Sequence, residues 1–302
     1  MSSSFHTNPA LATPVEVSVP ARQRDVPGWI WLAGPYAVCL LAFLLIPLIN
    51  VVVLSFYTYS PILIWLPKLT LANYSALLTP YFANVAVRTL RIAAVATSLC
   101  LVLGYPVAYY LARCSRQALT VGMFILTLPL MVSAVVGSFG WIVIMGRNGL
   151  LNLGLAQLGL DARLSILYTE SAVVIALVHF LLPLMVLPLM ASIEKIPIRL
   201  EEAAINLGGS PLVTFRRVIL PMSRTGMMSG IVLCFSIALS VVVISLLLGG
   251  RAGRMFGNEV YEQVITAGNW PFASALSTVL VVLIVLSIAA AMALSRSGTR
   301  SR

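Results

Sequence analysis

The sequence predicts an all-α membrane protein, a polytopic bundle of six transmembrane helices. Of its 302 residues, 60% are hydrophobic and only 9% are charged, whereas a soluble domain carries about 25% charged residues. The apolar residues form long runs, and about 20 such residues suffice for a helix to cross a bilayer. We expect these runs to be helical because a helix satisfies its own backbone hydrogen bonds in lipid.

The predicted spans cover residues 29–57, 86–112, 119–146, 171–193, 225–248 and 273–294. The first and third exceed the length of a straight crossing, so we expect them to tilt or to kink at Pro47 and Pro129. Residues 29–295 then form one transmembrane domain between polar tails at 1–28 and 296–302. The first tail contains several prolines and no apolar core, which predicts a flexible segment and not a cleavable signal peptide.

The positions of Lys and Arg predict that both termini face the cytoplasm, since cytoplasmic loops carry an excess of these residues. With that orientation, the inside segments hold most of the 19 basic residues. The short inside loop 113–118 and the C-terminal tail are basic and contain no acid. The outside segments 58–85, 147–170 and 249–272 contain turn-forming residues, and we expect short helices on the membrane surface there.

The net charge and the cysteines do not indicate nucleic-acid binding, disulfides or metal binding. The net charge of +10 does not predict nucleic-acid binding, because the basic residues occur singly or in pairs between apolar runs. The four cysteines are Cys39, Cys100, Cys114 and Cys234. They form no CxxC pair, and three of them lie in apolar runs. We interpret them as small buried hydrophobic residues, and the sequence predicts no disulfide, metal site or cofactor.

The inside stretch 195–221 carries more charge than its apolar surroundings. Pro197 suits the start of a helix, and Glu201 and Glu202 follow early, where the helix dipole favours acids. Residues 198–207 contain no helix breaker. The pattern predicts a first short helix on the cytoplasmic side.

A second short helix is predicted directly after it. Gly208 and Gly209 are typical of a helix C-terminus, and Ser210 with Pro211 behind it is typical of a new N-terminus. Pro221 is expected to close this second helix. Because apolar residues alternate with the charges, the two helices form either an amphipathic loop on the membrane or a docking element for a soluble partner.

The residues of this stretch carry a resemblance to a known family. Glu202-Ala203-Ala204, then Gly208 after three residues, then Val218 and Leu220-Pro221, resembles the EAA loop of bacterial ABC importer permeases of the type I class. The family usually has Ile at the position of Val218. The segments "LTLANYSALL" (69–78), "GYPVAYYLAR" (104–113) and "GNEVYEQVITAGNWPFASALS" (257–277) are similar to the polyamine-type branch, which includes spermidine/putrescine permeases.

The resemblance implies a permease subunit of an ATP-driven importer in a bacterial inner membrane. Its expected partners are two ATP-binding cassette subunits, a second permease subunit (identical or a sister), a periplasmic substrate-binding protein and the lipid bilayer. The EAA loop would be the coupling helix that docks on the ATPase. The predicted coupling site consists of Arg199, Glu201, Glu202, Ala203, Ala204, Gly208, Ser210 and Pro211.

The chain departs from the polyamine-type branch at two places. That branch often has a Gly-Glu-Phe-like stretch after the fifth span, where this chain reads "SVVVISLLLGG" (240–250). An Arg often found in the third span is Gly137 here, in "SAVVGSFGW". Both departures remove charge from the expected pathway and weaken the case for a strongly cationic substrate.

Polar residues inside the spans are candidates for a translocation path. They are Ser133, Ser138 and Trp141 in the third span, His179 in the fourth, and Ser236 and Ser240 in the fifth. Helix packing is the alternative role for the serines, and an interhelical hydrogen bond is the alternative for the histidine. A protease dyad at His179 lacks a Gly-x-Ser-x-Gly elbow, so no catalytic residue is predicted.

The alternative function is a secondary carrier or channel without an ATPase partner. The chain has no phosphate-binding loop, since neither Lys68 nor Lys195 follows a glycine. None of its nine acids lies within a predicted span, whereas ion-coupled carriers often bury acids at mid-membrane. We therefore expect a transport subunit that is not itself an enzyme, and co-purification of an ATPase would separate the two functions.

Overall fold

The structure is a computed structural model that describes residues 29–158 and 164–297. The contacts divide the chain after Leu48 into two units. The first unit contributes only the beginning of helix α1 (Trp29–Leu54), an uncharged helix that is apolar enough to cross a membrane from Pro35 onward. The predicted tails 1–28 and, beyond Ser297, 298–302 lie outside the described residues.

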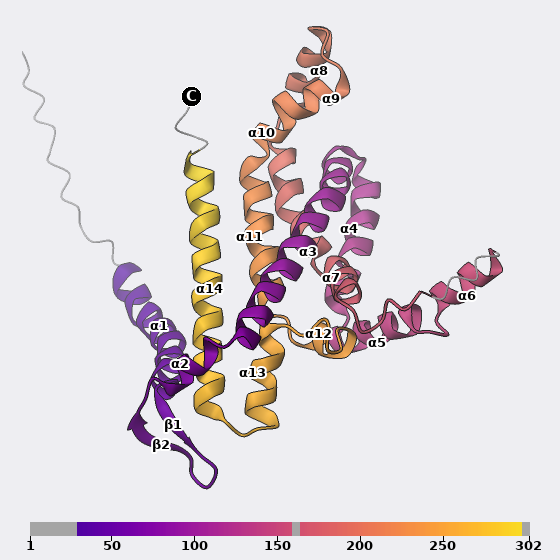
Figure 1. Ribbon diagram of the computed structural model, residues 1–302. Coiled ribbons are helices and arrows are strands. Elements are labelled where there is room, and N and C mark those ends of the chain that lie inside the picture. Colours follow the sequence, from indigo (N-terminus) through magenta and orange to yellow (C-terminus); the bar gives the residue numbers. More distant parts are fainter. Residues whose placement is uncertain (1–28, 159–163, 298–302) are drawn as a thin grey trace, which may run out of the picture. The chain divides into compact units, whose positions relative to one another are not determined.

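The second unit contains the remaining elements, shown in Figure 1. They are β1 (Tyr57–Ser60), β2 (Ile64–Leu69), α2 (Ala72–Leu77), α3 (Pro80–Arg113), α4 (Arg116–Met131), α5 (Ala134–Met145), α6 (Leu150–Gln157), α7 (Glu170–Glu194), α8 (Ile198–Asn206), α9 (Pro211–Thr214), the π-helix η1 (Phe215–Ile219), α10 (Leu220–Met222), α11 (Arg224–Ser240), α12 (Val243–Leu248), α13 (Phe256–Ile265) and α14 (Trp270–Ser297).

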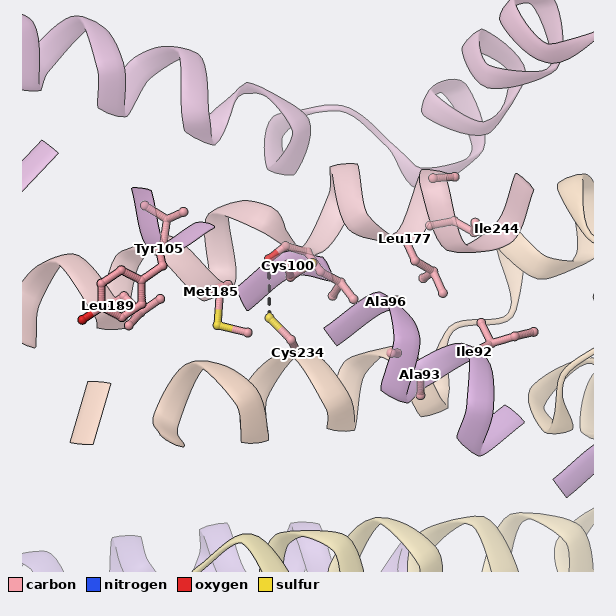
Figure 2. Packing of buried hydrophobic residues seen from close by; sticks show 14 of the residues in the cluster. Ile92, Ala93, Ala96, Cys100, Tyr105, Leu177, Met185, Leu189, Cys234 and Ile244 are labelled. Carbon is pink, nitrogen blue, oxygen red and sulfur yellow. Dashed lines mark hydrogen bonds between the residues drawn. The ribbon is translucent and has the colours of Figure 1, made fainter. Parts of the chain in front are cut away.

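Helix α7 forms the centre of the core, between α3 and α11. Its buried large residues recur every fourth position, and each is fully inaccessible to solvent: Leu177, Leu181, Met185, Leu189 and Ile193. Figure 2 shows three of them, Leu177, Met185 and Leu189, among side chains of α3 and α11. Residues four apart lie on one face of a helix, so α7 presents a continuous bulky ridge.

The helices beside this ridge present small residues at the same spacing. On α3 they are Ala96, Cys100, Gly104 and Ala108, and on α11 they are Gly226, Gly230, Cys234 and Ala238; all are buried. Small residues let helix backbones approach closely, which is how helices associate in lipid. The sulfurs of Cys100 and Cys234 lie 3.6 and 3.5 Å from the carbonyl oxygens of Val178 and Leu181 on α7. The prediction of small buried hydrophobic residues is therefore confirmed for these two cysteines, but it is wrong for Cys39, which is exposed, and Cys114 is only partly buried.

The six predicted spans correspond to helices, but two of them are broken. Among the described residues, five helices are long and apolar enough to cross a membrane, and a sixth is obtained if Pro211–Met222 and Arg224–Ser240 count as one bent span. The predicted span 119–146 is two helices, α4 and α5, and the predicted kink at Pro129 is a full interruption at Val132–Ser133. The predicted span 225–248 is likewise interrupted between α11 and α12.

The two interruptions have a common structural setting. Helices α5 and α12, the short pieces that follow the breaks, pack against each other at one end of the bundle (Figure 1). Ser133 caps the new helix, because its hydroxyl accepts a hydrogen bond from the Val135 amide. The pieces turn away from their parent helices and are held by this mutual contact.

One segment predicted to lie outside contains a small strand hairpin besides a short helix. Strands β1 and β2 form an antiparallel hairpin within the predicted loop 58–85, followed by α2. The Asn73 side chain of α2 donates hydrogen bonds to the carbonyl oxygens of Ser55 and Tyr57, at 2.8 and 2.9 Å. These bonds fix the base of the hairpin next to the end of α1. The other two segments predicted to lie outside contain short helices, α6 and α13, and α5 with α6 (Ala134–Gln157) is together long and apolar enough to cross a membrane.

Candidate functional site

The charged loop between α7 and α11 has the predicted helix–glycine corner–helix geometry. Helix α8 begins directly after Pro197 and ends before Gly208, whose φ of +86° lies in the left-handed region that glycine adopts without strain. The amide of Gly209 donates to the carbonyl oxygen of Ala204 at 3.0 Å, which closes the helix end. Ser210 then caps α9 by accepting a hydrogen bond from the Val213 amide.

The second part of the loop is longer than predicted. Pro221 lies inside α10 and does not close the segment, which continues from α9 through η1 to Met222. Pro221 has no amide hydrogen, so it cannot donate to the carbonyl oxygen of Arg217 four residues earlier. In the wider π-helical turn before it, the Leu220 amide donates to the carbonyl oxygen of Phe215, five residues earlier. The segment then meets α11 at an angle of 69°.

The loop exposes apolar side chains, which we call the tip surface: Ile198, Leu200, Ile205, Leu207, Leu212 and Val213. Leu207 is 89% exposed and Leu212 is 64% exposed. Figure 1 shows α8 and α9 at the far end of the bundle, beyond the α3–α4 turn. Large apolar residues gathered on a projecting loop are typical of a surface that meets another protein or a membrane.

The predicted coupling residues do not all face outward. Arg199, Glu202, Ala203, Gly208, Ser210 and Pro211 are exposed, and Ala204 is half-buried. Glu201 is 9% exposed and points back to α3, where its carboxylate pairs with Arg113. Sequence reasoning missed Arg113 and its neighbour Tyr109, because these residues lie about 90 positions from Glu201 and no local pattern links them.

A cavity of about 300 Å³ brings together four of the six predicted path residues. Ser133, the N-cap of α5, and Ser138 and Trp141 within that helix reach it from one side, and His179 reaches it from α7. The rings of Trp141 and His179 meet edge to face, with centroids 5.6 Å apart. The other residues that line the cavity are apolar, and they include Gly137.

The cavity lies beside both helix interruptions. Val132 and Ser133 of the α4–α5 break line it, and Ile244 of α12 completes the wall. Non-helical backbone at membrane depth is tolerated where protein surrounds it or where it borders a cavity. The breaks that divide the predicted third and fifth spans thus coincide with the candidate path.

The structure does not bring the other two path residues to this cavity. Ser240 lines a separate cavity of about 320 Å³, together with residues of α13 and α14. Ser236 is in neither lining; its buried hydroxyl has no hydrogen-bond partner among the described residues. These two candidate path residues of the fifth span therefore lie away from the cavity that the other four line.

This bundle, with its broken helices around a cavity and its projecting helical loop, defines a multi-pass transport protein of the permease type. A family model described as "Binding-protein-dependent transport system inner membrane component" matches residues 100–297, and the chain belongs to that family. It is therefore a permease subunit of a binding-protein-dependent ABC importer, located in the inner membrane. The family and the six-span permease fold expected from the EAA-like residues are confirmed.

Two relatives show the branch. The chain is 37% identical over 250 residues to the spermidine/putrescine transport system permease protein PotB of Haemophilus influenzae, covering 82% of this chain and 87% of the relative. It is 36% identical to PotB of Escherichia coli strain K12, covering 82% and 91%. Both relatives are transport permease subunits.

A solved structure shows the same fold. A chain in the crystal structure of a bacterial alginate ABC transporter, in complex with an alginate pentasaccharide-bound periplasmic protein, superposes with a TM-score of 0.75 at 17% identity. The match covers 90% of this chain and 96% of that one. At this identity the likeness concerns the fold.

Proposed function

We propose that this permease subunit passes a polyamine or a related small organic solute from a periplasmic binding protein to the cytoplasm, driven by ATP hydrolysis on separate subunits. The single observation that carries the proposal is the exposed tip surface on the glycine-cornered loop. An apolar, ordered surface of this kind needs a protein partner if it lies in water. Arg199, Glu202, Ala203, Gly208, Ser210 and Pro211 supply the outward-facing part of the proposed docking site.

The proposed assembly contains two ATPase subunits and a second permease subunit, identical or a sister. Helix α5 also has an apolar face that does not line the cavity. Its large residues Val135, Val136, Phe139 and Val143 are exposed, which supports a partner within the membrane. Such a face packs against lipid or against another membrane protein. A second permease at this place would enclose the open side of the cavity.

We also propose that both termini face the cytoplasm. Within the second unit, α8, the α3–α4 turn and the end of α14 lie at the same end of the bundle (Figure 1). Basic residues gather at that end, including Arg113, Arg116, Lys195, Arg199 and Arg216, as expected for a cytoplasmic face. Because the ATPase is expected in the cytoplasm, retention of the ATPase by the loop would test this orientation as well.

The relatives' names suggest the substrate class, and the cavity suggests how a cation would be held. No carboxylate is among the described residues that line the cavity, and Gly137 is one of the lining residues, at the position where the resemblance leads us to expect a charged residue in the branch. An aromatic face attracts an ammonium group by a cation–π interaction, and Trp141 offers such a ring. We therefore propose that Trp141 contacts the passing solute, with the hydroxyls of Ser133 and Ser138 and the His179 ring beside it.

Reconstitution in liposomes tests the proposed function. The purified chain alone is expected to hydrolyse no ATP. The complete assembly is expected to hydrolyse ATP and accumulate labelled spermidine only when the binding protein is present. Uptake driven by an ion gradient without the ATPase would contradict the proposal and favour a secondary carrier.

Removing the Trp141 ring is expected to lower spermidine uptake about 2- to 30-fold, because a cation–π contact contributes roughly 0.5–2 kcal/mol. Trp141→Phe keeps an aromatic face and should retain most of the uptake that Trp141→Ala loses. Ser240→Ala, in the other cavity, is the control and should transport normally. The measurement is initial uptake rate per inserted transporter; equal rates for Trp141→Ala and the parent would remove Trp141 from the path.

A further inference from the structure

The carboxylate of Glu201 is held by the last turns of α3. Arg113, the final residue of α3, donates to Glu201 Oε1 from Nη2 at 2.5 Å and from Nε at 3.1 Å. The Tyr109 hydroxyl donates to the other oxygen, Oε2, at 2.8 Å. The side chains of Arg113 and Glu201 are only 16% and 12% exposed. This ion pair is largely shielded from solvent, and both carboxylate oxygens accept hydrogen bonds, so it differs from an ordinary surface salt bridge.

Arg113 also contacts the start of the loop, just before α8. Its Nη2 donates to the carbonyl oxygen of Ile196 at 2.9 Å, and Ile196 itself is 2% exposed. One guanidinium therefore bridges the end of α7 and the first turn of α8. Both ends of this corner are fixed to α3.

The second half of the loop is attached to the same face of α3. The hydroxyl of Tyr105 lies 2.6 Å from the hydroxyl of Ser223, at the bend into α11. The Tyr105 ring also meets Phe215 of η1 edge to face, with centroids 5.0 Å apart. Tyr105, Tyr109 and Arg113 are spaced four residues apart, so they form one stripe along α3. We call these three residues the α3 stripe.

Neighbouring glutamates of the loop consequently have different surroundings. Successive helical residues are about 100° apart around the axis. Glu201 faces the α3 stripe, whereas Glu202 is exposed on the side available to a partner. The acid of the EAA-like triplet is Glu202, so the internal contact belongs to the residue before it.

We propose that Arg113 and Glu201 are positioning residues that connect the loop to α3, so that a movement imposed on the loop by the ATPase passes directly into this span. Helix α3 is suited to carry such a movement. It is helical over 34 residues, with Pro106 inside it, packs along α7 and α11, and in its first half pairs through Arg91 with Glu170, the first residue of α7. The inference rests on the proposed function, in which an ATPase moves the loop.

The test uses the complete reconstituted transporter and three readouts: ATPase subunits retained on purification, ATP turnover, and solute molecules transported per ATP hydrolysed. Glu201→Gln and Arg113→Gln are expected to keep the ATPase bound and to lower transport per ATP at least about tenfold. The exchanged pair Arg113→Glu with Glu201→Arg is expected to regain part of that ratio, because it restores an ion pair between α3 and α8. Glu202→Gln, the matched neighbour, is expected to lower ATPase retention instead.

Tyr109→Phe provides a milder variant, since it removes one hydrogen bond and leaves the ion pair in place. A reduced transport-to-ATP ratio at normal abundance supports the connection through the α3 stripe. An unchanged ratio in Tyr109→Phe, Glu201→Gln and Arg113→Gln overturns it. If Gly208→Asp and Glu202→Gln also leave ATPase retention unchanged, the docking role of the loop fails separately.

Thermal unfolding of the isolated chain in detergent tests whether the Arg113–Glu201 ion pair forms, independently of its role in transmitting movement. The single variants Glu201→Gln and Arg113→Gln, compared with the double variant, should show coupled and not additive shifts in melting temperature. This result does not require any ATPase. Additive shifts would contradict the ion pair itself, whatever the function of the loop.

Discussion

Gly208→Asp is expected to abolish solute uptake while the chain still inserts into the membrane at normal abundance. The backbone at Gly208 has a φ of +86°, a region that Asp tolerates better than most residues. A Cβ atom there would meet no atom of the described residues within 4 Å, so the first side-chain carbon introduces no clash. The carboxylate would instead project beside the tip surface, where a docked ATPase leaves it desolvated and unpaired.

The energy of that change is comparable with the energy of docking. Burying a charge without a partner costs several kcal/mol in proteins, and each factor of ten in affinity corresponds to about 1.4 kcal/mol. The measurement is uptake, membrane abundance and ATPase co-purification for the variant and the parent. Loss of uptake together with loss of the ATPase supports docking.

Gly268 supplies a matched control for this experiment. It also has a positive φ, +63°, and a side chain there would likewise meet no described atom within 4 Å. However, it lies in the α13–α14 turn at the opposite end of the bundle (Figure 1). Gly268→Asp should therefore keep the ATPase bound. Normal uptake by Gly208→Asp would return the loop to the interpretation of an amphipathic segment resting on the membrane.

Gly226→Ala is expected to destabilise the bundle strongly, although it adds only one methyl group. That carbon would lie 2.4 Å from the carbonyl oxygen of Pro188 and 2.4 Å from the Ser192 Cβ atom. Neither the backbone oxygen nor the Cβ atom can move without shifting α7 relative to α11. Overpacking of this kind typically costs about 1–3 kcal/mol, and we expect lower membrane abundance and a lower melting temperature in detergent.

Gly140→Ala is the corresponding control, because the added methyl group at Gly140 in α5 would meet no atom of the described residues within 4 Å. In a helix, alanine is favoured over glycine by about 1 kcal/mol, so this variant should be as stable as the parent or slightly more stable. If Gly226→Ala unfolds at the same temperature as Gly140→Ala, the close crossing of α7 and α11 is not the contact that holds the core.

The sequence also contains a signal for this close crossing, in the spacing of small residues within the spans. Gly226 and Gly230 form a small-xxx-small pair, a pattern typical of helices that pack closely in membranes. The matching small residues of α3 follow the same four-residue spacing. Such patterns indicate which face of a span packs, but they do not indicate against which helix.

Features that depend on neighbouring residues could be predicted from the sequence alone. The apolar runs predicted the spans because each run must satisfy its own backbone in lipid. Pro197, Gly208 and Ser210 predicted the corner between α8 and α9, because start and stop signals act within a few residues of a helix end. The family followed from the EAA-like loop, where identity and spacing are both local.

Features that depend on contacts between distant segments emerged only in the folded chain. The breaks before α5 and α12 bring these short helices into contact, and the cavity beside them collects Ser138 and His179 while excluding Ser240. The EAA-like triplet assigns its acid to Glu202, but the sequence does not show that the adjacent Glu201 faces inward. Arg113 separates them, because a carboxylate leaves water only where a cation and hydrogen-bond donors replace it.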